Sequence, residues 1–185
     1  MAYLTKSAVL ARAAKDVGLK AKAESLLEAA NQQFSASKTY DIFLSHSYQD
    51  AQLVLGAKLK LEDKGFTVYV DWIDDNQMSR DNVNKKTAET LRIRMKVCKS
   101  FLYLATNNAG HSKWMPWELG FFDGLKKNKI AILPVLANAD QDFNGQEYLS
   151  LYPIVKDYSI LNDLYVSGDG AFINLGQWVA SNSGF

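Results

Sequence analysis

The stretch SFLYLATNNAGHSKWMPWELGFFDGLKKNKIAILPVL, residues 100–136, decides how this chain folds. It contains two short apolar runs, SFLYLAT (100–106) and IAILPVL (130–136), with a helix-forming segment, WMPWELGFFDGLKK (114–127), between them. The apolar runs do not alternate with polar residues, which is typical of strands that are buried on both faces. The stretch therefore predicts a β-α-β unit with parallel strands.

The same succession of strand and helix continues on both sides of this unit. Further strands are expected at YDIFLS (40–45), FTVYVDW (66–72) and LYV (164–166). Further helices are expected at 51–65, 82–99 and 170–182. Strands that alternate with helices predict an α/β three-layer sandwich around a five-stranded parallel sheet, with right-handed crossovers.

The first 38 residues have a different composition. Residues 3–17 and 19–35 are rich in Ala, Leu, Lys and Glu, which favour helix, and Gly18 between them is in a helix-stop position. We expect an N-terminal helical extension, built as a helical hairpin, at 1–38 and the α/β domain at 39–185. Because two short helices rarely persist alone, the hairpin is expected to dock on its own domain, and docking on a partner is the alternative.

Composition argues against several classes of function. The formal net charge of +1 gives no strong field toward nucleic acid or an anionic membrane, so neither is expected as a partner. Two histidines and one cysteine, Cys98, argue against a tetrahedral zinc site, and no metal site is expected. The opening residues, MAYLTKSAVLARAAKDVG, lack an apolar run long enough for a signal peptide or a membrane span. A cytoplasmic protein is expected.

Ligands of open parallel sheets bind beyond the carboxyl ends of the strands. Three polar segments are expected at that edge: Ser45, His46, Ser47 and Tyr48; Trp72 to Asp81; and Thr106 to Trp117. Neither the glycine-rich phosphate loops GxGxxG and GxxxxGK[ST] nor the nucleophile elbow GxSxG occurs in the chain. A nucleotide at this edge would therefore be held without the usual fingerprints.

One carboxylate stands among aromatic side chains where the helix after the 100–106 strand begins. Trp114 and Glu118 are four residues apart, so a helix places them on one face, about 6 Å apart at Cβ. If Met115 is the N-cap and Pro116 the first helical residue, Glu118 is the third, where a carboxylate meets the helix dipole. The alternative is that Glu118 is a reactive group. Trp114 is then either a core side chain or a ring that stacks on a base.

The boxes YDIFLSHSYQD (40–50), GFTVYVDW (65–72) and W-x-x-W-E-L-G (114–120), followed by the strand IAILPV (130–135), resemble those of Toll/interleukin receptor (TIR) domains, particularly bacterial ones. The resemblance covers about residues 39–182 and implies a flavodoxin-like fold. Many bacterial members of the family cleave NAD at the nicotinamide–ribose bond. Some cyclise the product into a signalling nucleotide that activates a separate effector during phage infection, as in Thoeris-type defence.

The resemblance also implies roles for single residues. Glu118 matches the catalytic glutamate of the family, and Trp114 matches a tryptophan that often contacts the nucleotide. Trp72 and Asp74 open the loop that moves over the site in the family. Arg80 in that loop is a candidate partner for a phosphate, and His46 is either a substrate contact or a solvated loop residue. With Glu118 as the catalytic residue, the predicted substrate-binding residues are Ser45, His46, Ser47, Tyr48, Trp72, Asp74, Arg80 and Trp114.

The chemistry of NAD cleavage is compatible with a single carboxylate. Nicotinamide leaves as a neutral base from a pyridinium, so it needs no proton, unlike the leaving group of most glycosidases. Negative charge beside the ribose stabilises the oxocarbenium-like transition state. Glu118 can supply this charge, with NAD as the substrate and no cofactor.

Two classes of function remain open. The first is an NAD+ nucleosidase or ADP-ribosyl cyclase, in which a base stacked on Trp114 would favour cyclisation over hydrolysis. The second is a non-catalytic signalling module that acts through TIR–TIR assembly. Self-association is expected, because active sites of the family are often completed between subunits. A separate effector is the expected partner of a cyclic product.

Overall fold

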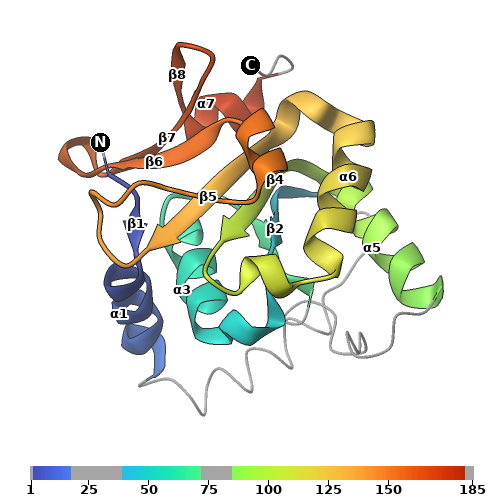
Figure 1. Cartoon of the computed structure of the whole chain (residues 1–185), viewed down its shortest axis with the longest axis horizontal. Helices are drawn as coiled ribbons and strands as arrows, with labels where there is room; N and C mark the ends of the chain where they lie inside the picture. The colour runs from blue at the N-terminus through green and yellow to red at the C-terminus, as the bar shows by residue number, and fades with distance from the viewer. Residues whose placement is uncertain (1, 18–38, 72–84, 182–185) are drawn as a thin grey trace.

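The computed structural model describes residues 2–17, 39–71 and 85–181. Its centre is a β-sheet with the strand order β3-β2-β4-β5-β6-β7-β8, and β1 pairs with β5 outside this order (Figure 1). Within the described residues, neighbouring strands from β3 to β6 are parallel, whereas β7 and β8 are antiparallel. The strands are β1 (Leu4–Thr5), β2 (Tyr40–Ser45), β3 (Val68–Tyr69), β4 (Cys98–Ala105), β5 (Ile130–Leu136), β6 (Ile154–Tyr158), β7 (Asp163–Gly168) and β8 (Ala171–Asn174).

Helices cover both faces of the sheet, because the buried strands present apolar side chains alternately to each face. Ile42 and Leu44 of β2 belong to the core beneath the first group of helices, and Phe43 belongs to the core beneath the second. The first group is α1 (Lys6–Val17), α3 (Ala51–Glu62) and α7 (Leu175–Ala180). The second group is α5 (Lys85–Val97) and α6 (Trp114–Lys126) (Figure 1). The predicted α/β three-layer architecture is confirmed.

The predicted position of the last parallel strand is wrong. The fifth parallel strand is β6, which pairs with β5 through Ile154 and Ile132, whereas residues 164–166 lie in antiparallel β7. The predicted helix at 170–182 is also wrong at its start, because β8 precedes α7. Asp169 and Gly170 have φ values of 45° and 75° and close a two-residue turn between β7 and β8. Two successive positive φ values match the twist of a hairpin, and Asp-Gly is a favoured sequence for such turns.

The N-terminal segment is part of the sheet and of its first core. Leu4 of β1 pairs in parallel with Val135 of β5, and the side chains of Leu4 and Val9 are buried. A Cβ on Gly56 of α3 would lie 2.1 Å from the carbonyl oxygen of Val9, so α1 and α3 approach at their backbones. Arg12 on α1 pairs with Asp63 at the end of α3, at 2.6 Å. The second helix expected at 19–35 lies outside the described residues.

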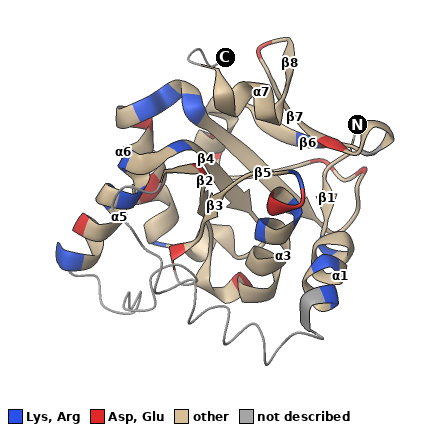
Figure 2. Cartoon of the chain, turned by 180° about the vertical axis from the view of Figure 1, so that it is seen from behind, with Lys and Arg blue, Asp and Glu red and all other residues tan. Residues whose placement is uncertain are grey.

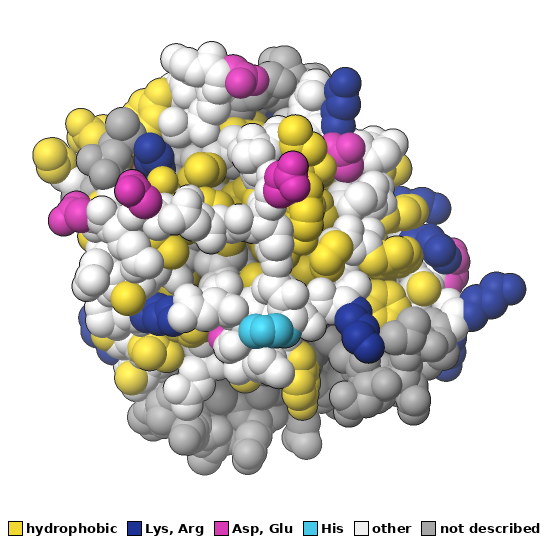
Figure 3. Space-filling model, viewed as in Figure 1, with side chains coloured by type: hydrophobic (Ala, Val, Ile, Leu, Met, Phe, Trp, Pro, Cys, Tyr) yellow, Lys and Arg dark blue, Asp and Glu magenta, His cyan; other side chains and the backbone are white. Residues whose placement is uncertain are grey.

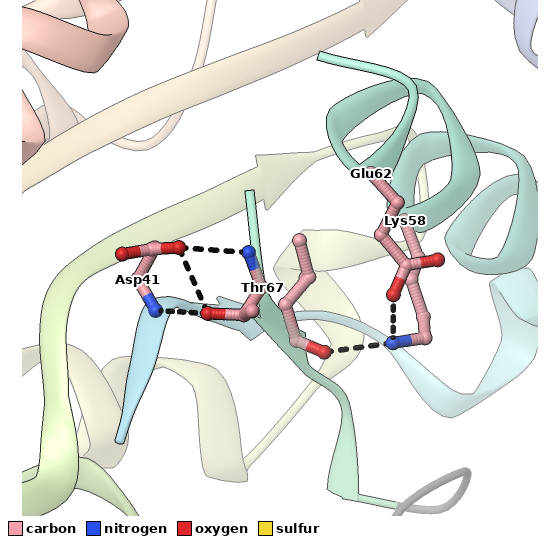
Figure 4. Close-up of polar contacts among 5 residues, drawn as sticks. Asp41, Lys58, Glu62 and Thr67 are labelled. Atoms are coloured by element: carbon pink, nitrogen blue, oxygen red, sulfur yellow. Dashed lines mark hydrogen bonds and ion pairs between the residues drawn. The ribbon is translucent and has the colours of Figure 1, made fainter. Parts of the chain in front are cut away.

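A network of side-chain hydrogen bonds holds the short strand β3 beside β2 (Figure 4). Asp41 Oδ2 accepts from the backbone N–H and the hydroxyl of Thr67, both at 2.8 Å. Lys58 Nζ donates to the carbonyl of Val68 at 2.7 Å, and Lys99 Nζ donates to Asp41 Oδ1 at 2.8 Å. Burial alone would raise the pKa of Asp41, but the hydrogen bonds from Lys99 and Thr67 outweigh it and the pKa is lowered.

The surface mixes charges of both signs, as the cartoon in Figure 2 and the space-filling view in Figure 3 show. Lysines gather where α6 ends and the chain turns toward β5. There Lys126 Nζ donates to the carbonyls of Lys96 and Cys98, and partial burial of the ammonium group lowers the pKa of Lys126. Among the described helices, none combines the length and the hydropathy that crossing a bilayer requires.

Candidate active site

Glu118 lies on the inner face of α6, and its side chain is fully buried (0% exposed). The hydroxyl of Ser45, at the carboxyl end of β2, donates a 2.5 Å hydrogen bond to Glu118 Oε2. Helix α6 begins at Trp114 with Lys113 as its N-cap, so Glu118 is the fifth helical residue and not the third. The N-terminal capping interpretation is therefore wrong. The carboxylate faces the end of the sheet instead.

The alternation of β2 explains how Ser45 reaches this carboxylate. Phe43 and Ser45 are two residues apart and so point to the same face of the sheet, and Phe43 lies in the core beneath α6. Ser45 is therefore directed at the helix that carries Glu118, 73 residues further along the chain. Both side chains were predicted site residues, and the structure brings them together.

His46 is also fully buried, so it is not a solvated loop residue. Its Nδ1 lies 2.9 Å from the carbonyl of Leu44. Because a carbonyl can only accept, Nδ1 is assigned the hydrogen. Its Nε2 lies 3.3 Å from Asp71 Oδ1, a separation at which the two groups form an ion pair when the imidazole is protonated. His46 thus connects the end of β2 to the segment after β3 and is directed at Asp71.

The next two predicted residues lie in different environments. Ser47 is buried and is the N-cap of a 3-10 turn (Tyr48–Asp50), where its hydroxyl accepts from the N–H of Gln49 at 3.4 Å. Tyr48 is 65% exposed. The loop after β2 therefore keeps Ser47 within the protein and directs Tyr48 into solvent.

Asp50 is a buried residue at the same end of the sheet that the sequence interpretation did not single out. Its carboxylate accepts from the hydroxyl of Thr106 at 2.5 Å and from the amide of Asn108 at 2.7 Å. An Asp directly before a helix normally indicates a side-chain cap. Asp50 stands directly before α3, but its side chain makes no such cap hydrogen bond. Asp50 instead ties the loop after β2 to the loop after β4.

Trp114 occupies the first turn of α6 and is 8% exposed. Its ring meets Trp117 edge-on, with centroids 5.4 Å apart and an interplanar angle of 84°. Arg92 of α5 lies over the Trp117 ring at 5.4 Å. The indole Nε1 of Trp114 is buried without a hydrogen-bond partner. Trp117 is therefore a packing residue, whereas Trp114 keeps an unused donor. The other predicted residues, Trp72, Asp74 and Arg80, lie outside the described residues.

A cavity of about 410 Å³ opens at the same edge of the sheet, between the loops after β4 and β5. Its lining includes Thr106, Asn107 and Gly110 from the first loop and Gln141, Asn144 and Gln146 from the second, and it does not include Glu118. Among the described residues, no three His, Cys, Asp or Glu side chains are grouped to hold a metal ion. The polar groups at this edge suit a ligand that offers hydrogen-bonding oxygens and nitrogens.

Comparisons with known proteins agree with this architecture. A family model described as TIR domain matches residues 42–159. The chain is 46% identical over 166 residues to the "Probable 3' cyclic ADP-D-ribose synthase ThsB'" of Bacillus cereus (strain MSX-D12), covering 86% of each chain. It is 29% identical over 96 residues to the "Putative cyclic ADP-D-ribose synthase TIR2" of Cytobacillus dafuensis, covering 51% of this chain and 25% of that protein. With a family model that spans the sheet from β2 to β6 and a relative this similar over most of its length, the chain belongs to the TIR domain family.

Proposed function

We propose that this protein is an NAD-cleaving TIR enzyme that makes a cyclic ADP-ribose-type signal in bacterial antiphage defence. The observation that carries the proposal is the buried Glu118 carboxylate, bonded by Ser45 at the ligand-binding edge of a TIR sheet. The proposal is supported by the name of the Bacillus cereus relative, a probable 3' cyclic ADP-D-ribose synthase that aligns along 86% of this chain.

The proposed reaction needs negative charge rather than an acid. As the bond between ribose and nicotinamide breaks, the electron pair leaves with the pyridine nitrogen and positive charge develops on the ribose. Glu118 stabilises that charge, and the hydrogen bond from Ser45 fixes the direction of the carboxylate. A buried site has a low local dielectric, which strengthens this interaction relative to water.

Cyclisation requires that a second part of the substrate, and not water, attacks the ribose cation. Burial around Glu118 favours this outcome, because it limits the water available for hydrolysis. In this proposal Trp114 stacks on a base and holds the dinucleotide folded. Since the Glu118 side chain is fully enclosed, substrate must displace part of this cover. We propose that Trp114 is the part of the cover that moves, because its indole N–H makes no hydrogen bond that would hold it in place.

The partners follow from the reaction. NAD is the substrate, no cofactor is required, and a cyclic nucleotide would act on a separate effector protein. Self-association of the TIR domains is part of the proposal. The proposed further substrate contacts are Ser47, Tyr48, Trp72, Asp74 and Arg80. His46 is proposed to support the site from within the protein, by its contact with Asp71, and not to touch the substrate.

The test is incubation of the purified protein with NAD, with free nicotinamide measured by chromatography and the nucleotide product identified by mass spectrometry. Glu118→Gln keeps the size of the side chain and removes its charge. We expect turnover to fall about a hundred- to a thousand-fold, the usual effect of losing one electrostatic stabiliser. Glu89→Gln is the matched control, because Glu89 is 58% exposed on α5 and, within the described residues, pairs with Arg92 on the same helix.

The result also separates the two classes of function. Wild-type protein that releases no nicotinamide would leave a non-catalytic TIR module as the better description. Turnover by wild type that survives Glu118→Gln would assign the reaction to another group. A linear ADP-ribose product would support NAD cleavage by this protein and contradict the proposed cyclisation.

A further inference from the structure

Tyr103 of β4 carries a buried hydroxyl group that makes no hydrogen bond. Unpaired buried polar groups are rare in folded proteins, because each forfeits its hydrogen bonds to water. The described ranges hold two more such donors, the indole nitrogens of Trp114 and Trp178. Trp178 lies on the opposite face of the sheet from Glu118, whereas Tyr103 and Trp114 share the core beneath α6. Two unused donors therefore occur on the face that carries the candidate catalytic residue.

The register of the sheet places Tyr103 next to this residue. Tyr103 is the partner of Ser45 across the parallel pair β2 and β4. Partner residues on neighbouring strands point to the same face, so the Tyr103 side chain and the Ser45 hydroxyl leave the sheet side by side. Since Ser45 bonds Glu118, Tyr103 lies beside the same carboxylate.

The electrostatic environment keeps the Tyr103 hydroxyl neutral. Burial raises the pKa of Tyr103, and the nearby Tyr148 hydroxyl and the Glu118 carboxylate raise it further. Tyr148 belongs to the 3-10 turn Glu147–Leu151 and is close enough to act on Tyr103 without forming a hydrogen bond in this structure. The hydroxyl is therefore protonated at neutral pH and remains a donor there, and it adds no second negative charge beside Glu118.

We propose that Tyr103 is a further substrate-contacting residue of the reaction, whose hydroxyl donates to an oxygen of the bound dinucleotide beside Glu118. The acceptor is a ribose hydroxyl or the carboxamide oxygen of the nicotinamide half. This inference rests on the proposed function of the site. It explains why a buried donor is left without a partner, because the partner arrives with the substrate.

Tyr103→Phe tests the inference, because it removes only the hydroxyl. An unpartnered hydroxyl contributes nothing to folding, so we expect Tm to stay the same or to rise. We expect kcat/KM for NAD to fall about tenfold or more, and by an equal factor across neutral pH, because the raised pKa keeps the hydroxyl protonated there. A Tyr103 with only a structural role would leave kcat/KM unchanged.

Tyr69→Phe is the matched control. Tyr69 is equally buried in the same core but stands on β3, on the far side of β2 from Tyr103, and we expect its variant to keep wild-type kcat/KM per folded molecule. The inference is overturned if Tyr103→Phe keeps kcat/KM within twofold of wild type. It is also overturned if Tm falls and the loss of folded protein accounts for the whole loss of activity. If wild type cleaves NAD and Tyr103→Phe cleaves it equally well, this inference fails and the proposed function of the site stands. Wild type without turnover overturns the proposed function, and the inference with it.

Discussion

Replacing Ser45 with alanine tests whether the hydrogen bond to Glu118 organises the site. The bond is 2.5 Å long, and both of its partners are fully buried, so water cannot take the place of the lost hydroxyl without a rearrangement. A hydrogen bond to a charged group contributes about 1.5–3 kcal/mol. In a protein of this size each kcal/mol shifts Tm by about 2–4 °C, so Ser45→Ala should lower Tm by about 3–12 °C.

The same bond also sets an expectation for activity. If it directs the carboxylate at the ribose in the transition state, losing about 1.5–3 kcal/mol corresponds to a fall of roughly 10- to 150-fold in kcat/KM. Differential scanning fluorimetry measures the stability, and nicotinamide release measures the activity of the same preparations. A large loss of both quantities is the expected outcome.

Ser100→Ala supplies the control for this experiment. Ser100 is also fully buried, but its hydroxyl donates to the neutral carbonyl of Asp41 at 2.7 Å. This bond lies near the amino ends of β2 and β4, away from the ligand-binding end of the sheet. Its loss should lower Tm by about 2–4 °C and leave turnover per folded molecule unchanged. The reasoning is refuted if the two variants lose equal stability and Ser45→Ala keeps wild-type kcat/KM.

Three further predictions concern the framework around the site. The pKa of Asp41 is lowered in the folded state, so its stabilisation is present above about pH 4 and is lost as the pH falls further; Asp41→Asn should therefore lower Tm at pH 7, and the difference from wild type should shrink below about pH 4 in a pH series of melting curves. Gly56→Ala should destabilise by about 1–3 kcal/mol or more in urea unfolding, because its Cβ meets the Val9 carbonyl at 2.1 Å, whereas Gly124→Ala meets nothing within 4 Å and should be neutral or stabilising. Asp50→Ala should lower Tm by about 3–12 °C and speed amide exchange in the loop after β4, and slow exchange there in the variant would contradict its bridging role.

The central part of the fold could be predicted because its strands are buried on both faces. IAILPVL was predicted as a strand over 130–136, and β5 has these bounds. The helix before it ends within one residue of the expected position. Uninterrupted apolar runs leave few alternatives, since every side chain needs a buried neighbour.

The far edge of the sheet could not be predicted in the same way. Strand β6 reads IVKDY, and only Val155 of its five residues is fully buried, so it lacks the apolar run that marks the inner strands. The hairpin between β7 and β8 did carry a signal in the dipeptide Asp169-Gly170, which the helix interpretation of 170–182 overrode. Local turn chemistry was the better guide there.

The candidate site was predictable in part. Ser45 and Glu118 were both expected at the ligand edge, because Ser45 ends one strand of the parallel sheet and Glu118 lies near the start of the helix that follows another. Tyr103 was hidden, because an aromatic residue inside an apolar strand is indistinguishable in sequence from a core side chain. Asp50 was hidden for a related reason: an Asp before a helix normally indicates a cap, and its bonds to Thr106 and Asn108 span 56 and 58 residues.

The pairing of β1 with β5 has a consequence for how the molecule folds and opens. The contact joins Leu4 to Val135, so it closes a loop that takes in most of the chain. Contacts between such distant residues form late, because the chain entropy lost on closure is recovered only when the inner strands are already in place. A β1 of two residues, docked on a complete β5, is thus expected to detach first during partial unfolding. In native-state hydrogen exchange, the amides of β1 and α1 would exchange at a lower opening free energy than those of β4 and β5, and the first helix would report the earliest loosening of the domain.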